Sequence, residues 1–283
     1  MNDHGTVLVS EQTRSPGLAP QGRGAIMAIG GAEDKFNDKL ILATFAQLAG
    51  GRQARSAIVP TASSIESAGE RYKAIFLGMG AASADVIFIA DRAAANATGP
   101  SDALRHATGI FLTGGNQVRL STIVGGTRVA EQVRERNERG AIVAGTSAGA
   151  SILSSHMVAF GASGETPKQR MVHMVAGLGL VPDLIIDQHF RQRNRIGRLL
   201  TLVAANPGLL GVGVDEDTAA LVDEHGTLEV IGRHSITIVD GRNMFTDIYQ
   251  VGGHGGITVS GAVLHVLTAG RRFDLKQRTL LTG

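Results

Sequence analysis

The chain has 283 residues, 43% of them hydrophobic and 18% charged, a composition typical of a globular protein with a sizeable buried core. A net charge of only +2 and the absence of tryptophan argue against nucleic acid as a partner. The absence of cysteine excludes disulfides, thiolate metal sites and a cysteine nucleophile, and the sequence has no run of about 18 apolar residues that would predict a membrane span.

Residues 1–24 are polar, contain proline and glycine, and lack the apolar core of a signal peptide. We therefore expect a flexible N-terminal arm. No linker or internal repeat divides the rest of the sequence, so we expect a single domain over residues 25–283. The cysteine-free composition is compatible with the cytoplasm, where we expect the protein to reside.

From residue 25 to about residue 145, short apolar runs alternate with helix-length segments, which is typical of a parallel sheet with crossover helices. The predicted strands are 25–29, 56–59, 85–89, 109–112 and 141–144, and the predicted helices are 35–49, 64–79 and 127–139. Each strand ends in a turn-rich sequence. Because open α/β sheets bind ligands at the carboxyl ends of their strands, we expect the functional site at these turns.

The second half of the chain has a different pattern. A strand at 184–189 precedes a predicted basic helix at 191–205, and a further strand ends near 211–217. Short β-type runs at 228–231 and 236–239, separated by turns, indicate antiparallel pairing. The predicted fold class is therefore α/β, with a mostly parallel central sheet, flanking helices and antiparallel C-terminal additions.

The segment Ile142-Val-Ala-Gly-Thr-Ser-Ala-Gly149 contains the pattern G-x-S-x-G, in which a strand turns sharply into a helix and presents one serine at its tip. A side chain at Gly145 or Gly149 would crowd that turn. We predict Ser147 as a nucleophile, because no cysteine competes with it. The N–H groups from Ala148 onward lie at a helix N-terminus, where they could stabilise an oxyanion. A phosphate-binding loop is the alternative interpretation of the motif alone.

A serine nucleophile needs a base within hydrogen-bond reach and a partner that orients the base. Among nine histidines, His189 follows directly after an apolar strand, which is the position that Ser147 also has. The order found in α/β-hydrolases, serine then acid then histidine, would instead need a base near the C-terminus, such as His254 or His265.

Three candidate acids, Asp215, Glu216 and Asp217, follow the apolar strand at 211–214. Alternation along a strand directs neighbouring side chains to opposite faces, so we expect one of these carboxylates to meet the histidine. A solvated acidic turn is the alternative interpretation.

Four motifs occur in this sequence in the order found in the cyanophycinase family, which the chain resembles from about residue 25 to residue 273. These motifs are Gly114-Gly-Asn-Gln117, Gly145-Thr-Ser-Ala-Gly-Ala150, Asp187-Gln-His-Phe190 and Asp215-Glu-Asp217. The resemblance implies a serine peptidase related to peptidase E, with a fold similar to class I glutamine amidotransferases. It implies no metal and no organic cofactor, and it implies a homodimer.

The resemblance also assigns roles to residues of this sequence. It implies Ser147 as nucleophile, His189 as base and Glu216 as the acid that orients it. The N–H groups of Gly115 and Ala148 would form the oxyanion hole. Gln117, Asp187 and Gln188 would line the substrate groove, although Asp187 could instead cap the following helix.

The substrate of that family, cyanophycin, is a poly-aspartate backbone with arginine attached to each β-carboxyl group. Arg191, Arg195 and Arg198 would share one face of the predicted helix, where guanidinium groups can bind carboxylates in pairs. The alternative is a solvated basic face. Together with Arg193, which points elsewhere on that helix, the predicted substrate-binding residues are Gln117, Asp187, Gln188, Arg193, Arg195 and Arg198.

These observations predict a serine-type exopeptidase that degrades cyanophycin to β-aspartyl-arginine dipeptides. Ser147, His189 and Glu216 would form its triad. Two alternatives stay open: an aspartyl dipeptidase similar to peptidase E, and an anion-binding module without catalytic activity.

Overall fold

Five parallel strands from the first half of the chain form the centre of the larger sheet. The computed structural model describes residues 22–282, so most of the predicted N-terminal arm lies outside the described residues. In spatial order the parallel strands are β1 (Ile26–Ile29), β5 (Ile142–Thr146), β4 (Gly109–Leu112), β2 (Arg55–Val59) and β3 (Ser83–Val86). This arrangement brings the carboxyl ends of β1 and β5 side by side.

Four antiparallel strands from the second half extend this sheet beyond β1, which gives nine strands in all. In order outward they are β10 (Thr218–Val222), β11 (Thr227–Gly232), β16 (Arg272–Asp274) and β17 (Thr279–Leu281). The prediction of a mostly parallel sheet with antiparallel C-terminal additions is therefore confirmed.

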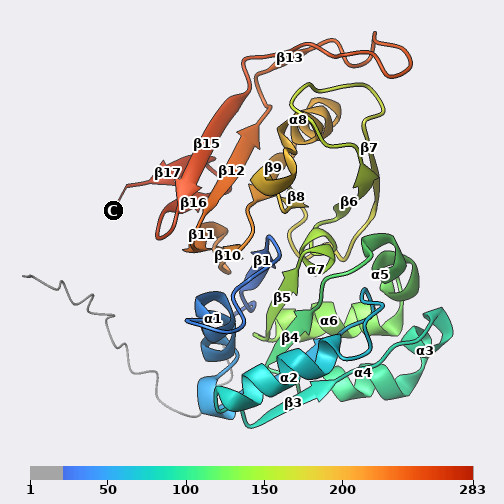
Figure 1. The fold of residues 1–283 in the computed structure, drawn as a ribbon, viewed down its shortest axis with the longest axis vertical. Helices are drawn as coiled ribbons and strands as arrows, with labels where there is room; N and C mark the ends of the chain where they lie inside the picture. The colour runs from blue at the N-terminus through green and yellow to red at the C-terminus, as the bar shows by residue number, and fades with distance from the viewer. Residues whose placement is uncertain (1–21, 283) are drawn as a thin grey trace, which may run out of the picture.

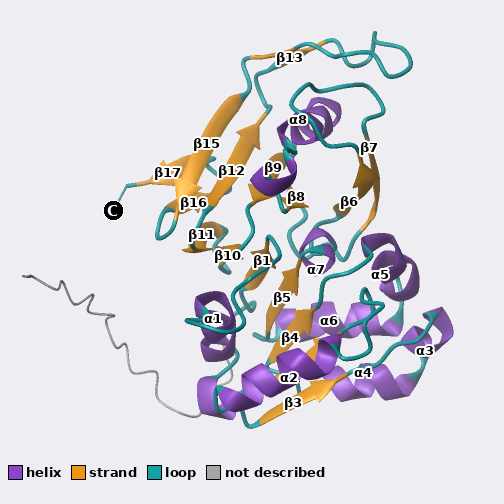
Figure 2. Cartoon of the chain, in the orientation of Figure 1, coloured by secondary structure: helices purple, strands orange, loops and turns teal. Residues whose placement is uncertain are grey.

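Helices cover both faces of the large sheet, as Figure 2 shows. One face packs against α1 (Leu40–Leu48) and α2 (Ala68–Gly78), which share a hydrophobic cluster with alternate residues of the strands. The other face packs against α3 (Arg92–Asn96), α4 (Thr98–Leu104), α5 (Gln117–Val124), α6 (Arg128–Glu138) and the short α7 (Ala148–Ser151). The strands are consequently buried on both sides, which explains their continuous apolar sequences.

A second sheet of four strands lies above the first in Figure 1. Its strands, in order, are β15 (Val263–Thr268), β12 (Ser235–Asp240), β9 (Leu210–Val214) and β8 (Leu184–Gln188). Helix α8 (Ile196–Ala205) packs on this sheet through Leu199, Leu202 and Val203. The remaining elements are the hairpin β6 (His156–Gly161) and β7 (Val172–Ala176), the pair β13 (Phe245–Thr246) and β14 (Val259–Ser260), and the 3₁₀ turns η1 (Gly51–Gln53) and η2 (Arg191–Arg193).

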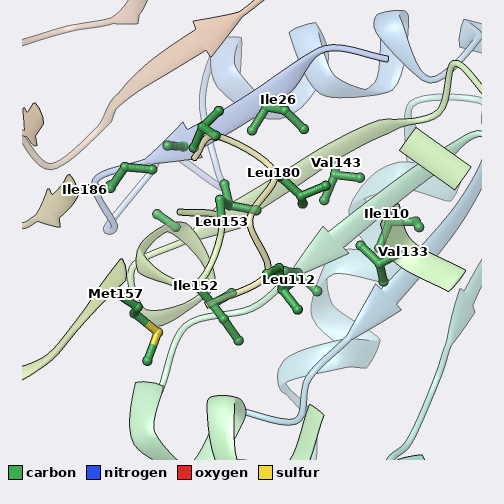
Figure 3. Close-up of a cluster of buried hydrophobic side chains, with 14 of the residues drawn as sticks. Ile26, Ile110, Leu112, Val133, Val143, Ile152, Leu153, Met157, Leu180 and Ile186 are labelled. Atoms are coloured by element: carbon green, nitrogen blue, oxygen red, sulfur yellow. The ribbon is translucent and has the colours of Figure 1, made fainter. Parts of the chain in front are cut away.

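One hydrophobic core joins the two sheets. It contains Ile26 and Val143 of the large sheet together with Ile186 of the small one. Figure 3 shows Leu153 and Leu180 in the same cluster. The burial of these side chains fixes the relative positions of β5 and β8, the two strands that lead into the site described below.

Two features of the second half differ from the sequence-based expectation. Strands β8 and β9 pair in parallel, although this half was expected to be antiparallel. The helix predicted at 191–205 is interrupted, because Asn194 has a left-handed backbone (φ 47°) and α8 begins only at Ile196. In the described part of the chain, no helix has both the length and the apolar character needed to cross a bilayer.

Candidate active site

Ser147 occupies a sharp turn between β5 and α7. Its backbone angles, φ 53° and ψ −113°, are unfavourable for a residue with a side chain and match the strained serine of a strand-to-helix elbow. A Cβ atom on Gly145 would lie 1.9 Å from the carbonyl oxygen of Gly149, and one on Gly149 would lie 2.2 Å from that of Leu112. The expectation that both glycines are required by crowding is confirmed.

His189 lies immediately after β8 and reaches across to the elbow. Its Nε2 atom is 2.9 Å from Oγ of Ser147. The imidazole packs against the backbone of Gly31, where an added Cβ would lie 2.3 Å from Cε1 of the ring. Only glycine leaves room for the ring in this place, and Gly31 also has a positive φ of 97°.

Of the three candidate acids, Glu216 is the one that contacts the histidine, with its Oε1 atom 2.6 Å from Nδ1 of His189. Asp215 is buried and accepts hydrogen bonds from the hydroxyl of Ser235 (2.9 Å) and the N–H of Arg191 (3.0 Å). Asp217 accepts the N–H of Asp34 at 2.8 Å. The three carboxylates therefore have three different sets of partners. This agrees with the prediction that only one of them meets the histidine.

The environment lowers the pKa of His189 below its ordinary value. Burial is the main cause, since the side chain is only 11% exposed, and the positive charges of Arg193 and Arg195 act in the same direction. The hydrogen bond to Glu216 opposes this shift. A neutral imidazole, with Nδ1 donating to Glu216 and Nε2 free to accept the serine proton, is the state that this arrangement favours near neutral pH.

The loop after β4 runs beside the serine. A Cβ atom on Gly114 would lie 3.2 Å from Cβ of Ser147, and Gly115 follows with a positive φ of 144°. The N–H of Gly115 donates to no acceptor within residues 22–282. The N–H of Ala148 lies at the first position of α7, and an N–H group at that position has no hydrogen-bond acceptor within its own helix.

A cleft of about 830 Å³ opens from this loop. It is lined by residues 62–65, by Gly114–Arg119 of the loop and α5, and by Ala159 and Phe160 of β6. Gln117 lies in its wall, half-buried, and its amide nitrogen donates to the carbonyl of Val158 at 2.8 Å. Ser147 is not among the lining residues, but Gly114 is, so the cleft adjoins the elbow at that glycine.

The prediction that Arg191, Arg195 and Arg198 share one face of a helix is wrong. Asp187, which is fully buried, accepts hydrogen bonds from Arg198, including Nε at 2.6 Å, and contacts Arg195 at 3.4 Å. Arg195 and Arg198 are only 7% and 3% exposed, while Arg191 is exposed and pairs with Asp215. The cause is the break at Asn194, which rotates the two later arginines toward the strand end.

The other predicted substrate residues differ in their access to solvent. Gln188 is buried, and its side-chain oxygen accepts a hydrogen bond from Arg195 at 3.0 Å. Arg193 is exposed on the turn that follows His189. Of the six predicted residues, only Arg193 and Gln117 therefore present more than a small part of their surface. Burial lowers the pKa of Arg195 to about 10, with the charges of Arg198 and Arg193 adding to the shift.

The two alternative bases, His254 and His265, have other surroundings than Ser147. His265 lies on β15, where its ring packs at 4.9 Å from that of Phe273. His254 lines a separate, smaller cleft together with Lys168. Among residues 22–282 no group of three or more His, Asp or Glu side chains is arranged to hold a metal ion.

Glu33 was not predicted as a functional residue, although it follows the glycine pair Gly30-Gly31 at the end of the first strand. Its carboxylate is 3% exposed and accepts the hydroxyl of Thr146, the residue before Ser147, at 2.6 Å. The sequence signal for this residue was a carboxylate placed shortly after a glycine pair at the end of the first strand.

Comparison with known proteins places the chain in a family. The sequence profile of peptidase family S51 matches residues 26–230. The chain belongs to this family. It is 45% identical over 260 residues to the cyanophycinase of Nostoc sp., an alignment that covers 91% of this chain and 87% of that protein. It is 42% identical over 257 residues to the cyanophycinase of Synechococcus elongatus, covering 90% and 80% of the two chains.

A solved structure confirms the fold. The crystal structure of a peptidase from an acI-B1 actinobacterium superposes on this chain with a TM-score of 0.61, covering 86% of this chain and 97% of that one. The two sequences are only 18% identical, so the likeness concerns the fold alone. Membership of family S51 makes the chain a serine peptidase.

Proposed function

We propose that this S51 peptidase hydrolyses cyanophycin and releases β-aspartyl-arginine dipeptides. The observation that carries the proposal is the hydrogen-bonded line from Ser147 through His189 to Glu216, in a chain 45% identical over 91% of its length to the cyanophycinase of Nostoc sp.. The cleft of about 830 Å³ adjoins the serine at Gly114 and leaves room for further residues of a substrate, which supports a polymeric substrate.

The proposed reaction begins when Oγ of Ser147 attacks the carbonyl carbon of a peptide bond between two aspartates of the backbone. Nε2 of His189 accepts the serine proton, and Glu216 stabilises the resulting imidazolium through Nδ1. The same imidazolium then donates its proton to the leaving amine. A water molecule repeats these steps on the acyl-enzyme, which restores the serine and releases the acid.

The oxyanion that forms in each half-reaction needs hydrogen-bond donors. We assign this role to the N–H groups of Gly115 and Ala148, which lie on either side of the serine on the β4 loop and α7. Because both are backbone groups, side-chain replacement at these positions does not remove the donors and acts only by moving the backbone.

For the substrate we propose contacts to Arg193 and Gln117, the two predicted binding residues with accessible surface. A guanidinium such as that of Arg193 fits the free α-carboxylate of an arginine that is attached to the cyanophycin backbone. Asp187, Arg195, Arg198 and Gln188 support the site from below in this proposal, because their polar groups are engaged with one another.

The substrate class is tested by comparing rates on cyanophycin and on short α-aspartyl dipeptides at equal concentrations of cleavable bonds. We expect kcat/KM for the polymer to exceed that for the dipeptides by at least about 100-fold, because the polymer makes several polar contacts with the enzyme that a dipeptide cannot make. A preference for the dipeptides would instead support an activity similar to peptidase E.

Two further proposals concern the state of the protein. The resemblance to cyanophycinases and the cysteine-free composition favour a cytoplasmic homodimer. Val263, Leu264 and Val266 on the edge strand β15 are each about half-exposed, which supports an interface there. Light scattering after size exclusion should give twice the mass of the chain, and a monomer mass would contradict the proposal.

A further inference from the structure

Three consecutive carbonyl groups at the end of β1 hold the three strand ends of the site. The carbonyl of Ile29 accepts the N–H of Ser147 at 3.0 Å, and that of Gly30 accepts the N–H of His189 at 2.8 Å. The carbonyl of Gly31 accepts the N–H of Asp217, next to Glu216, at 2.9 Å. One short segment therefore contacts the backbone of all three parts of the triad.

The residues held in this way share a strained backbone. Ser147, His189 and Asp217 have φ values of 53°, 47° and 48°, which residues with side chains adopt only when the surroundings fix them. Each of them donates its N–H to a carbonyl of the segment 29–31. The position of this segment consequently decides where Ser147, His189 and Glu216 lie relative to one another.

The segment is itself held by a buried carboxylate. Glu33 is 3% exposed, and its Oε2 atom accepts the hydroxyl of Thr146 at 2.6 Å. Its Oε1 atom accepts the hydroxyl of Tyr72 from α2 and pairs with Nζ of Lys35 at 2.9 Å. Burial and the charge of Glu33 raise the pKa of Tyr72 far above its ordinary value, so the phenol keeps its proton and donates it.

A buried carboxylate costs solvation free energy, and apolar residues of similar volume often give equal or greater stability. The burial of Glu33 is therefore better explained by the parts of the chain that its hydrogen bonds hold together. The bond to Thr146 ties the β1–α1 loop to the residue directly before the nucleophile, while the bond to Tyr72 ties the same loop to the helix α2 on that face of the sheet.

We propose that Glu33 is a positioning residue, which sets the distance between the Ser147 elbow and the loop that carries His189 by accepting the hydroxyl of Thr146. It touches neither substrate nor reacting atoms in this role. The inference rests on the proposed function only in naming Ser147 as the nucleophile. A displacement of about 1 Å between nucleophile and base lowers a rate by up to roughly 100-fold, so this device affects catalysis without contributing a catalytic group.

The test measures the reactivity of Ser147 without any peptide substrate. Phenylmethylsulfonyl fluoride is incubated with wild type, Thr146→Val, Thr146→Ser and Glu33→Gln, and the sulfonylated fraction is followed by intact-protein mass spectrometry. Ser147→Ala identifies the labelled site. Glu70→Gln, at an exposed position of α2 where the carboxylate pairs with Lys73, serves as the matched control for loss of a carboxylate.

We expect Thr146→Val to label at least about tenfold more slowly than wild type, whereas Thr146→Ser, which keeps the hydroxyl, labels within about twofold of it. On cyanophycin, Thr146→Val should lower kcat with KM changed by less than about twofold, when the rate is divided by the concentration of folded protein measured by circular dichroism. Glu33→Gln should behave as Thr146→Val does, and Glu70→Gln as wild type does.

The proposal is overturned if Thr146→Val unfolds at the wild-type temperature and labels at the wild-type rate. This variant decides the question even where Glu33→Gln fails to fold, because Val replaces Thr with almost no change of volume. If wild type labels at Ser147 but leaves cyanophycin intact, the proposed function fails while the role of Glu33 is judged from the labelling rates alone.

Discussion

Oε1 of Glu216 lies 2.6 Å from Nδ1 of His189, and this contact fixes the histidine tautomer in which Nε2 can accept a proton from Ser147. Replacing Glu216 by Gln keeps the shape of the side chain but removes its charge and places an amide donor beside Nδ1. We expect kcat on cyanophycin to fall by about 10³-fold to 10⁴-fold, the loss seen when the acid of such a triad is made an amide. Steady-state kinetics check this, with Asp223→Asn, in the turn between β10 and β11, as control. A loss below about tenfold would mean that Glu216 does not orient the base.

The buried pairing of Asp187 with Arg198 and Arg195 predicts an effect on stability. In Asp187→Asn both guanidiniums keep their burial and lose their counter-charge. We expect the free energy of unfolding to fall by about 3 to 5 kcal/mol. Urea denaturation followed by circular dichroism measures it. An unfolding free energy within about 1 kcal/mol of wild type would show that this buried ion pair adds little to stability.

Arg193 should influence the pH dependence of the reaction. Its positive charge lowers the pKa of His189, so Arg193→Gln raises that pKa and moves the acidic limb of the kcat/KM profile to higher pH. Arg193→Lys keeps the charge and should leave the limb in place. Profiles over pH 4 to 9 distinguish the variants, with Arg52→Gln on the turn after α1 as control. A limb that moves to lower pH in Arg193→Gln would contradict the electrostatic account.

Gly31 should tolerate no side chain. In Gly31→Ala the new Cβ would lie 2.3 Å from Cε1 of His189, at a φ of 97° that alanine rarely adopts. The ring must shift away from Ser147, so we expect kcat to fall by about 100-fold or more. Gly80→Ala is the matched control, because its φ is also positive (90°) but nothing lies within 4 Å of the added Cβ. Equal activity of the two variants would show that the ring is not confined by Gly31.

Much of this arrangement could be predicted from the sequence because it depends on local signals. The glycines around Ser147 are required by backbone contacts within a few residues, and the apolar runs before Ser147 and His189 are buried strands of two sheets. The choice of Glu216 among three adjacent carboxylates followed from a family resemblance, since alternation alone could not separate it from its neighbours.

Other features depend on contacts that the sequence pattern does not reveal. The helix predicted from residue 35 begins only at Leu40, because the carboxylate of Asp34 binds the N–H groups of residues 36, 37 and 39. The burial of Arg198 follows from its pairing with Asp187 on a neighbouring strand end. Glu33 escaped prediction for the same reason, since its partners Tyr72 and Thr146 are distant in sequence.

We propose that Ser147 attacks the backbone of cyanophycin. The most direct measurement incubates purified cyanophycin with wild type and with Ser147→Ala and follows the release of β-aspartyl-arginine by mass spectrometry. We expect the dipeptide to accumulate with wild type and to form at least about 10³-fold more slowly with Ser147→Ala, in which only the nucleophilic hydroxyl is removed. No release by wild type, or equal release by the two proteins, would contradict it.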